Sequence, residues 1–204
     1  MENQLLQVEQ LIPDMESLGQ PETNHSTYLT LSRHPACTGL TELDALFPGH
    51  SKKVLRVDNR LNIDYPHMEI VLVDSEQEKI LNYTTCIIND AIRINDKPTL
   101  HTAVWRPLFD VNEEAIHRLS KSTFSGYLLG EYNIMATLGN LQTHGFTFWL
   151  SRVCASRAEH IRVFGYKVST GELRPITRSD QRSTEKIWLW NVDNTQYRLL
   201  ITAR

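Results

Sequence analysis

The chain has 204 residues, of which 41% are hydrophobic and 22% are charged, and its formal net charge is −3. That length suffices for one domain with a sizeable core, and the slightly acidic balance excludes bulk attraction to nucleic acids or anionic membranes. No apolar run approaches the roughly 20 residues that cross a bilayer. The acidic, amphipathic N-terminus resembles neither a signal nor a transit peptide. We therefore expect a cytoplasmic protein, monomeric or homodimeric, that binds neither nucleic acid nor membrane.

The N-terminal stretch predicts a short helix and a polar connection. Apolar residues at helical spacing within residues 5–12 give one apolar face, and Pro13 ends it. Residues 14–27 are polar and contain glycine and proline, which predicts a linker or surface loop. The expected organisation is an N-terminal helix and linker (1–27) followed by one domain (28–204).

The next part of the chain changes from helical to strand periodicity. Residues 38–47 carry leucine and phenylalanine on one helical face and end before a Pro-Gly pair. Alternation and β-branched residues then predict strands at 54–58, 69–73 and 79–88. The last two strands are separated by a short polar turn and predict a hairpin. Residues 89–102 are interpreted mostly as loop.

A helical pair is predicted in the middle of the chain. Asp110 followed three residues later by Glu113 resembles a capping box. Apolar residues within 111–119 recur at helical spacing, and after a Ser-Lys-Ser break Phe124 and Tyr127 restart the pattern. We expect this pair to pack over a sheet.

The last third of the chain is again rich in strand patterns. Alternating residues predict strands at 146–154, 161–168, 173–177, 185–192 and 196–202. A proline in the third of these strands favours the edge of a sheet. The final two strands would form an additional C-terminal hairpin, residues 183–204. The predicted fold is therefore α+β, with a single antiparallel β-sheet and helices packed against it.

Familiar catalytic and cofactor motifs are absent from the sequence. It contains no phosphate-binding glycine loop, no nucleophile elbow and no HExxH motif. The eight histidines never fall at HxH or HxxxH spacing, and the three cysteines form no CxxC pair. We therefore expect neither a metal site nor a cofactor, which leaves cofactor-free chemistry or binding.

One polar cluster could recognise a small carboxylic acid. Its members are Arg152, Arg157, Glu159, His160 and Arg162. Arginine forks bind carboxylates through two hydrogen bonds, and a buried glutamate can transfer a proton. The alternative is a solvated charged turn between two strands. Glu69 is a further candidate ligand contact, because it is the only charge before an apolar run.

The order of elements resembles the chorismate lyase family, whose fold also serves the UTRA effector-binding domains of bacterial regulators. The strand at 54–58, the hairpin at 69–88, the helical pair and the arginine-rich strands follow in that order. Thr123-Phe124-Ser125-Gly126 occupies the place of the family's Thr-Pro-Leu-Gly-like turn. Met68-Glu69-Ile70-Val71-Leu72 is similar to its hairpin strand of Arg-Glu-Ile-Leu-Leu type. The resemblance covers roughly residues 38–180.

The resemblance implies elimination of pyruvate from chorismate, leaving 4-hydroxybenzoate, without a cofactor. Met68 stands where the family has its carboxylate-binding arginine, so Arg56, Arg152 or Arg157 would replace that residue. Glu159 would be the catalytic acid, although an alignment through Gly171 and Pro175 places Arg178 near that position instead.

The same resemblance implies a pocket closed by the apolar walls Phe124 and Leu40. The ligand would be a small carboxylic acid. Two alternatives stay open: a non-catalytic small-molecule-binding domain of the same fold, and a protein–protein accessory module that uses the tryptophan-bearing C-terminal hairpin.

Overall fold

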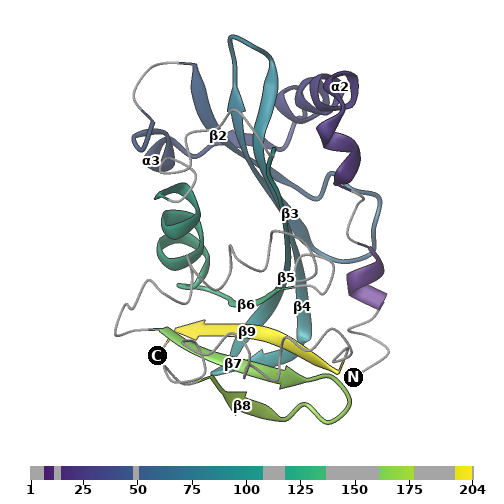
Figure 1. Cartoon of the computed structure of the whole chain (residues 1–204), viewed down its shortest axis with the longest axis vertical. Helices are drawn as coiled ribbons and strands as arrows, with labels where there is room; N and C mark the ends of the chain where they lie inside the picture. Colours follow the sequence, from purple (N-terminus) through teal and green to yellow (C-terminus); the bar gives the residue numbers. More distant parts are fainter. Residues whose placement is uncertain are drawn as a thin grey trace.

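The structure is a computed structural model that describes residues 7–11, 15–47, 51–107, 118–136, 161–176 and 196–203. Within these residues the chain forms an α+β fold around one nine-stranded sheet. The sheet is strongly twisted, so that the later strands β7 and β9 cross the direction of β3 and β4 (Figure 1). The expected α+β class is confirmed.

The strands follow one another along much of the sheet. Their bounds are β1 Cys37–Gly39, β2 Lys52–Asp58, β3 His67–Asp74, β4 Lys79–Ile94, β5 Lys97–Trp105, β6 Asn133–Ala136, β7 Ile161–Lys167, β8 Leu173–Pro175 and β9 Tyr197–Ala203. The spatial order is β1-β2-β3-β4-β5-β6-β9-β7-β8. All neighbours are antiparallel except β5 and β6, which are parallel. The sheet is therefore mixed rather than wholly antiparallel, because the helical connection between β5 and β6 returns the chain in the same direction.

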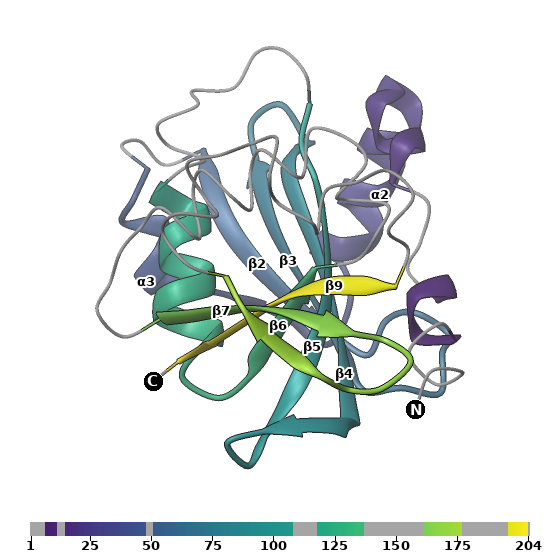
Figure 2. The same ribbon diagram turned by 60° about the horizontal axis from the view of Figure 1, so that its bottom comes forward.

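Helices cover both faces of the sheet. The 3₁₀-helix η1 (Glu16–Gly19) leads into α2 (Pro21–Ser32), which lies on one side, whereas α3 (Thr41–Asp44) and the π-helix η2 (Ser122–Leu128) lie on the other side (Figures 1 and 2). Side chains alternate across a strand, so each strand contributes to both faces. We call the side with Val57, Val71 and Tyr83 the α2 face, and the side with Ile70 and Cys86 the π-helix face.

The largest core lies on the π-helix face. Its buried members come from the sheet, from α3 and from the helical region, and include Ile70, Leu100, Phe124, Leu128 and Ile134. Two smaller cores share the α2 face, one beneath α2 and one at the β6–β9–β7 end. Burying apolar surface at about 25 cal/mol per Å² makes the larger core the main source of stability.

Helix α2 falls on residues that the sequence pattern assigned to a loop. That interpretation was wrong for residues 16–27, because Pro21 occupies the first turn of a helix, where proline is favoured. Only Leu31 of α2 is fully buried, so the helix lacks an apolar stripe. It docks instead through Asn24, whose side chain accepts from the Ile80 N–H (2.7 Å) and donates to the Ile80 carbonyl (3.1 Å). The expected boundary at residue 27 falls within this helix.

Several predicted strands are confirmed. The hairpin of β3 and β4, the strand β2 and the strand β7 lie where alternation placed them. Strand β8 with Pro175 is the last strand of the sheet, as a proline-bearing edge strand should be. The strand at 196–202 is confirmed as β9. The helix start at 110–117, the strand at 146–154 and the hairpin partner at 185–192 lie outside the described residues.

The loop expected at residues 89–102 is wrong. Strand β4 continues to Ile94 and β5 begins at Lys97, with Asn95 and Asp96 between them. Both turn residues have positive φ (52° and 62°), as in the type I′ turns that match the twist of a hairpin. The Asn95–Asp96 pair favours such a turn, and it is the sequence signal that the loop interpretation missed. The register also shifts between Asn89 and Arg93, which interrupts the alternation there.

The positive φ at Asp96 gives a test of this hairpin. We expect Asp96→Val to lower the free energy of unfolding by about 1–2 kcal/mol, because a β-branched residue is strained in the left-handed region. Asp96→Gly should be close to neutral, and Asp90→Val, outside the turn, is the matched control. Equal losses for the two valine variants in urea unfolding would contradict the turn geometry.

Candidate functional site

Four of the seven predicted site residues are described, and three of them gather on one face. Arg56 on β2, Leu40 before α3 and Phe124 in η2 belong to the π-helix face. Glu69 lies on the α2 face, because it is adjacent to Ile70 in the strand. Glu159, Arg152 and Arg157 lie outside the described residues.

Arg56 is held between two polar partners. Its Nε lies 3.0 Å and 3.1 Å from the two carboxylate oxygens of Asp58, which is two residues further along the same face of β2. A terminal nitrogen lies 2.9 Å from Asp58 Oδ1. The other terminal nitrogen donates to the Tyr127 hydroxyl at 2.5 Å, and the guanidinium carbon is 5.9 Å from the centre of that ring. The sheet and the π-helix therefore meet at this arginine.

The guanidinium keeps hydrogen-bonding capacity beyond these contacts. It carries five N–H donors, and the contacts to Asp58 and Tyr127 use three of them. One hydrogen on each terminal nitrogen therefore has no partner among the described residues. The Arg56 side chain is 28% exposed, so part of it faces solvent. Partial burial lowers the pKa of Arg56, but the hydrogen bonds that it donates to Asp58 and Tyr127 raise the pKa by more, so Arg56 stays charged.

The π-helix places Tyr127 beside this cation. Phe124 is buried in the large core, and Leu40 packs against the same core. Lys97 at the start of β5 fixes the end of the helix, since its Nζ donates to the carbonyls of Leu129 (3.2 Å) and Gly130 (2.7 Å). π-helices are rare and frequently mark functional sites. The result is a half-exposed cation at the margin of an apolar core.

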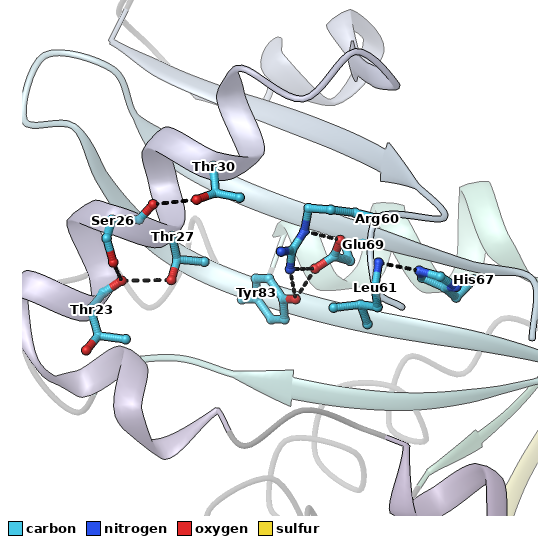
Figure 3. Close-up of polar contacts among 9 residues, drawn as sticks. All are labelled: Thr23, Ser26, Thr27, Thr30, Arg60, Leu61, His67, Glu69 and Tyr83. Atoms are coloured by element: carbon cyan, nitrogen blue, oxygen red, sulfur yellow. Dashed lines mark hydrogen bonds and ion pairs between the residues drawn. The ribbon is translucent and has the colours of Figure 1, made fainter. Parts of the chain in front are cut away.

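Glu69 has a different environment on the α2 face. Its carboxylate accepts two hydrogen bonds from Arg60, at 2.8 Å and 2.6 Å, and one from the Tyr83 hydroxyl (Figure 3). The Glu69 side chain is fully buried. Burial and the neighbouring carboxylate raise the pKa of Tyr83, so the phenol remains a donor. Glu69 and Arg56 therefore point to opposite sides of the sheet and cannot contact one small ligand together.

The Arg60–Glu69–Tyr83 cluster holds down the connection between β2 and β3. Arg60 comes from this connection, and the next residue, Leu61, donates its N–H to His67 Nε2 at 2.9 Å (Figure 3). His67 Nδ1 lies 2.8 Å from the Tyr65 carbonyl, which makes Nδ1 the protonated nitrogen of a neutral ring. The cluster thus fixes an irregular segment against the sheet.

Sequence patterns missed two further buried polar residues on the α2 face, His101 and Arg198. His101 lies on β5, opposite Ile87, and its Nε2 is 3.3 Å from the amide nitrogen of Asn89. Arg198 lies at the start of β9 and pairs with Glu9. His101 was obscured because its strand was interpreted as loop. A lone arginine in an alternating strand gave no signal of its partner 189 residues away.

The described residues contain no group of three or more histidine, cysteine or acidic side chains that could hold a metal ion. Nor does any described helix have the length and apolar character needed to cross a membrane. Burial raises the pKa of the Cys86 thiol to about 12, so this cysteine is unreactive at neutral pH.

Comparison with known proteins finds no match to this chain among protein-family models, curated proteins or solved structures.

The buried carboxylate gives a stability prediction. We expect Glu69→Gln to lower the free energy of unfolding by about 3 kcal/mol, because it leaves Arg60 half-buried without its counter-charge. Glu78→Gln in the exposed β3–β4 turn is the matched control and should leave the urea midpoint unchanged. An unchanged midpoint for Glu69→Gln would show that the pair contributes nothing net.

His101 gives a pH prediction. Burial, assisted by the charge of Arg198, lowers the pKa of His101 to about 4 from an unfolded value near 6.5. The stability it contributes is therefore complete above pH 6.5 and is lost as the pH falls towards 4. We expect about 2 kcal/mol of this loss between pH 7 and pH 5. His101→Gln should remove it and the exposed His25→Gln should retain it; parallel pH profiles of the two variants would refute the assignment.

Proposed function

We propose that the protein binds a small aromatic carboxylic acid on the π-helix face, with the ligand carboxylate on Arg56. The observation that carries this proposal is the half-exposed guanidinium with two uncommitted N–H donors beside Tyr127. Arginine binds carboxylates through parallel hydrogen bonds. The apolar side chains of the neighbouring core, Leu40 and Phe124 among them, suit an aromatic ring.

Charge balance sets the strength of such a site. Asp58 already offsets the charge of Arg56, and its side chain is 37% exposed, so the ligand gains little from long-range attraction. The gain comes from charge-assisted hydrogen bonds, about 1.5–3 kcal/mol each before solvent screening, and from contact with the ring. We therefore expect a dissociation constant of roughly micromolar to millimolar magnitude, which suits a metabolite sensor or an enzyme–substrate complex.

A catalytic function of chorismate lyase type is the second candidate. The turn Thr123–Gly126, which resembles the family's turn, falls within the π-helix. The next residue, Tyr127, contacts Arg56, the residue proposed to bind the ligand carboxylate. In this reaction the ether bond between the ring and the enolpyruvyl group breaks. The ring loses a proton and becomes aromatic, and the enolpyruvate takes up a proton to give pyruvate. Glu159 would protonate the leaving oxygen, and Arg152 or Arg157 would hold the second carboxylate.

Ligand binding can be tested by thermal unfolding with 4-hydroxybenzoate. A ligand at about 100 times its dissociation constant stabilises the native state by about 2.7 kcal/mol. We expect Arg56→Gln to weaken binding at least roughly tenfold, because that substitution removes the charge that holds the carboxylate. Arg93→Gln, an exposed arginine in the β4–β5 hairpin, is the matched control. Equal shifts for the two variants would place the ligand elsewhere.

Turnover is tested separately with chorismate. The lyase candidate requires 4-hydroxybenzoate and pyruvate in equal amounts, and loss of both products in Glu159→Gln with 4-hydroxybenzoate binding retained. Binding without turnover in the wild-type protein would leave the sensor function and reject the lyase.

A further inference from the structure

A second arginine on the opposite face is already bound to a carboxylate, that of Glu9. Arg198 Nε lies 2.5 Å from Glu9 Oε1, and a terminal nitrogen lies 2.7 Å from Glu9 Oε2. This is the side-on, two-bond geometry of carboxylate recognition. The Arg198 side chain is 1% exposed and that of Glu9 is 13% exposed. Glu9 belongs to a single helical turn, residues 7–10, whose Val8 is fully buried.

The surroundings of Arg198 contain a polar group with unused capacity. Arg198 lies on the same face as His101, and its charge acts on the imidazole. His101 is fully buried, and its Nδ1 finds no hydrogen-bond partner among the described residues. Buried polar atoms are nearly always paired, so this nitrogen has capacity for a further hydrogen-bond partner. The carboxylate of Glu9 satisfies the arginine but leaves this nitrogen unused.

Further buried polar atoms without a hydrogen-bond partner among the described residues lie along the same face. Thr99 on β5 is level with Asn133 on β6, and extending the printed β6–β9 register by one residue brings Thr202 level with Asn133. Thr99 Oγ1, Asn133 Oδ1 and Thr202 Oγ1 are all buried without a partner among the described residues. Within the described part of the chain, four neighbouring residues on one face therefore carry buried polar atoms that are available for a further hydrogen bond.

A purely structural function explains this arrangement poorly. A buried ion pair often contributes no more to stability than apolar residues of the same volume would. The pair also brings together elements that the rest of the fold does not require to touch, since β9 is already fixed between β6 and β7. Figures 1 and 2 show the N-terminal turn beside the start of β9, outside the sheet. The N-terminal turn therefore supplies the Glu9 carboxylate to the Arg198 guanidinium from outside the sheet.

We infer that Arg198 and His101 form a second binding site, for a small aliphatic carboxylate, which Glu9 occupies as an internal ligand. An incoming carboxylate takes the two bonds that Arg198 makes to Glu9. Because His101 Nε2 accepts from the Asn89 amide, its Nδ1 carries the proton and donates to a hydroxyl oxygen of that ligand, which favours hydroxy acids over simple acids. Displacement of Glu9 releases the turn at residues 7–10 from the sheet, so occupancy is coupled to the N-terminal segment. This site is independent of the one proposed at Arg56.

The direct test is acetate binding to a variant that lacks the internal ligand. In the full chain with Glu9→Ala, acetate should raise the melting temperature saturably, with an apparent affinity at least roughly tenfold higher than in the wild-type protein. Chloride at equal ionic strength is the salt control. Glu22→Ala, an exposed glutamate of α2, is the matched variant and should respond as the wild type does. An equal response in Glu9→Ala and Glu22→Ala, or none in Glu9→Ala, overturns the proposal.

All variants are compared in an Arg56→Gln background, which separates this site from the other one. Persistence of the acetate response there supports the Arg198 site, and its loss there refutes it. If Glu9→Ala does not fold, hydrogen exchange of the Arg56→Gln chain, which keeps Glu9, answers the question. Saturating acetate should accelerate exchange at residues 7–11 at least twofold and leave α2 unchanged, and unaltered exchange at residues 7–11 overturns the proposal. Lactate in place of acetate should act at lower concentration, through His101.

Discussion

The alternation of side chains along a sheet that is covered on both faces is the constraint on which the rest of this structure depends. All eight residues of β3 are buried, so a polar side chain in that strand must find its partner inside the protein. Glu69 and Ile70 are neighbours in the chain but belong to different cores. Burial on both sides thereby divides the polar residues into two separate sets, and it prevents Arg56 and Glu69 from acting on one ligand.

Burial also decides which arginine can bind a ligand directly. Arg60 and Arg198 each face a glutamate through two short bonds, whereas Arg56 faces Asp58 at the protein surface. Removing a carboxylate from a buried arginine costs several kcal/mol, because the remaining charge is desolvated. At a half-exposed arginine, water solvates the charge and compensates for part of that loss. The ligand proposed for Arg56 would therefore need no change in the fold, whereas the one proposed for Arg198 would require the N-terminal turn to move.

Local patterns in the sequence predict the elements whose cause is local. Alternation located β2, β7 and the hairpin of β3 and β4, and Pro175 located an edge. Helix α2 was missed because it docks through Asn24 rather than through an apolar stripe. The parallel pairing of β5 and β6 depends on a long connection and has no local signature. In the candidate site, the family resemblance pointed to Arg56, Leu40 and Phe124, but the partner of Glu69 was not recognised.

The two buried pairs differ in how they are reached during folding. Arg60 and Glu69 are nine residues apart, so their contact closes a short loop as the β2–β3 hairpin forms. Glu9 and Arg198 are 189 residues apart, and closing a loop of that length in an open chain costs roughly 3 kcal/mol more by the logarithmic law. The sheet must therefore bring β9 into place before the N-terminal turn can dock on it. A contact that forms after the sheet, through one helical turn, can open again without unfolding the sheet, which is the property that an internal ligand must have if it is to be displaced.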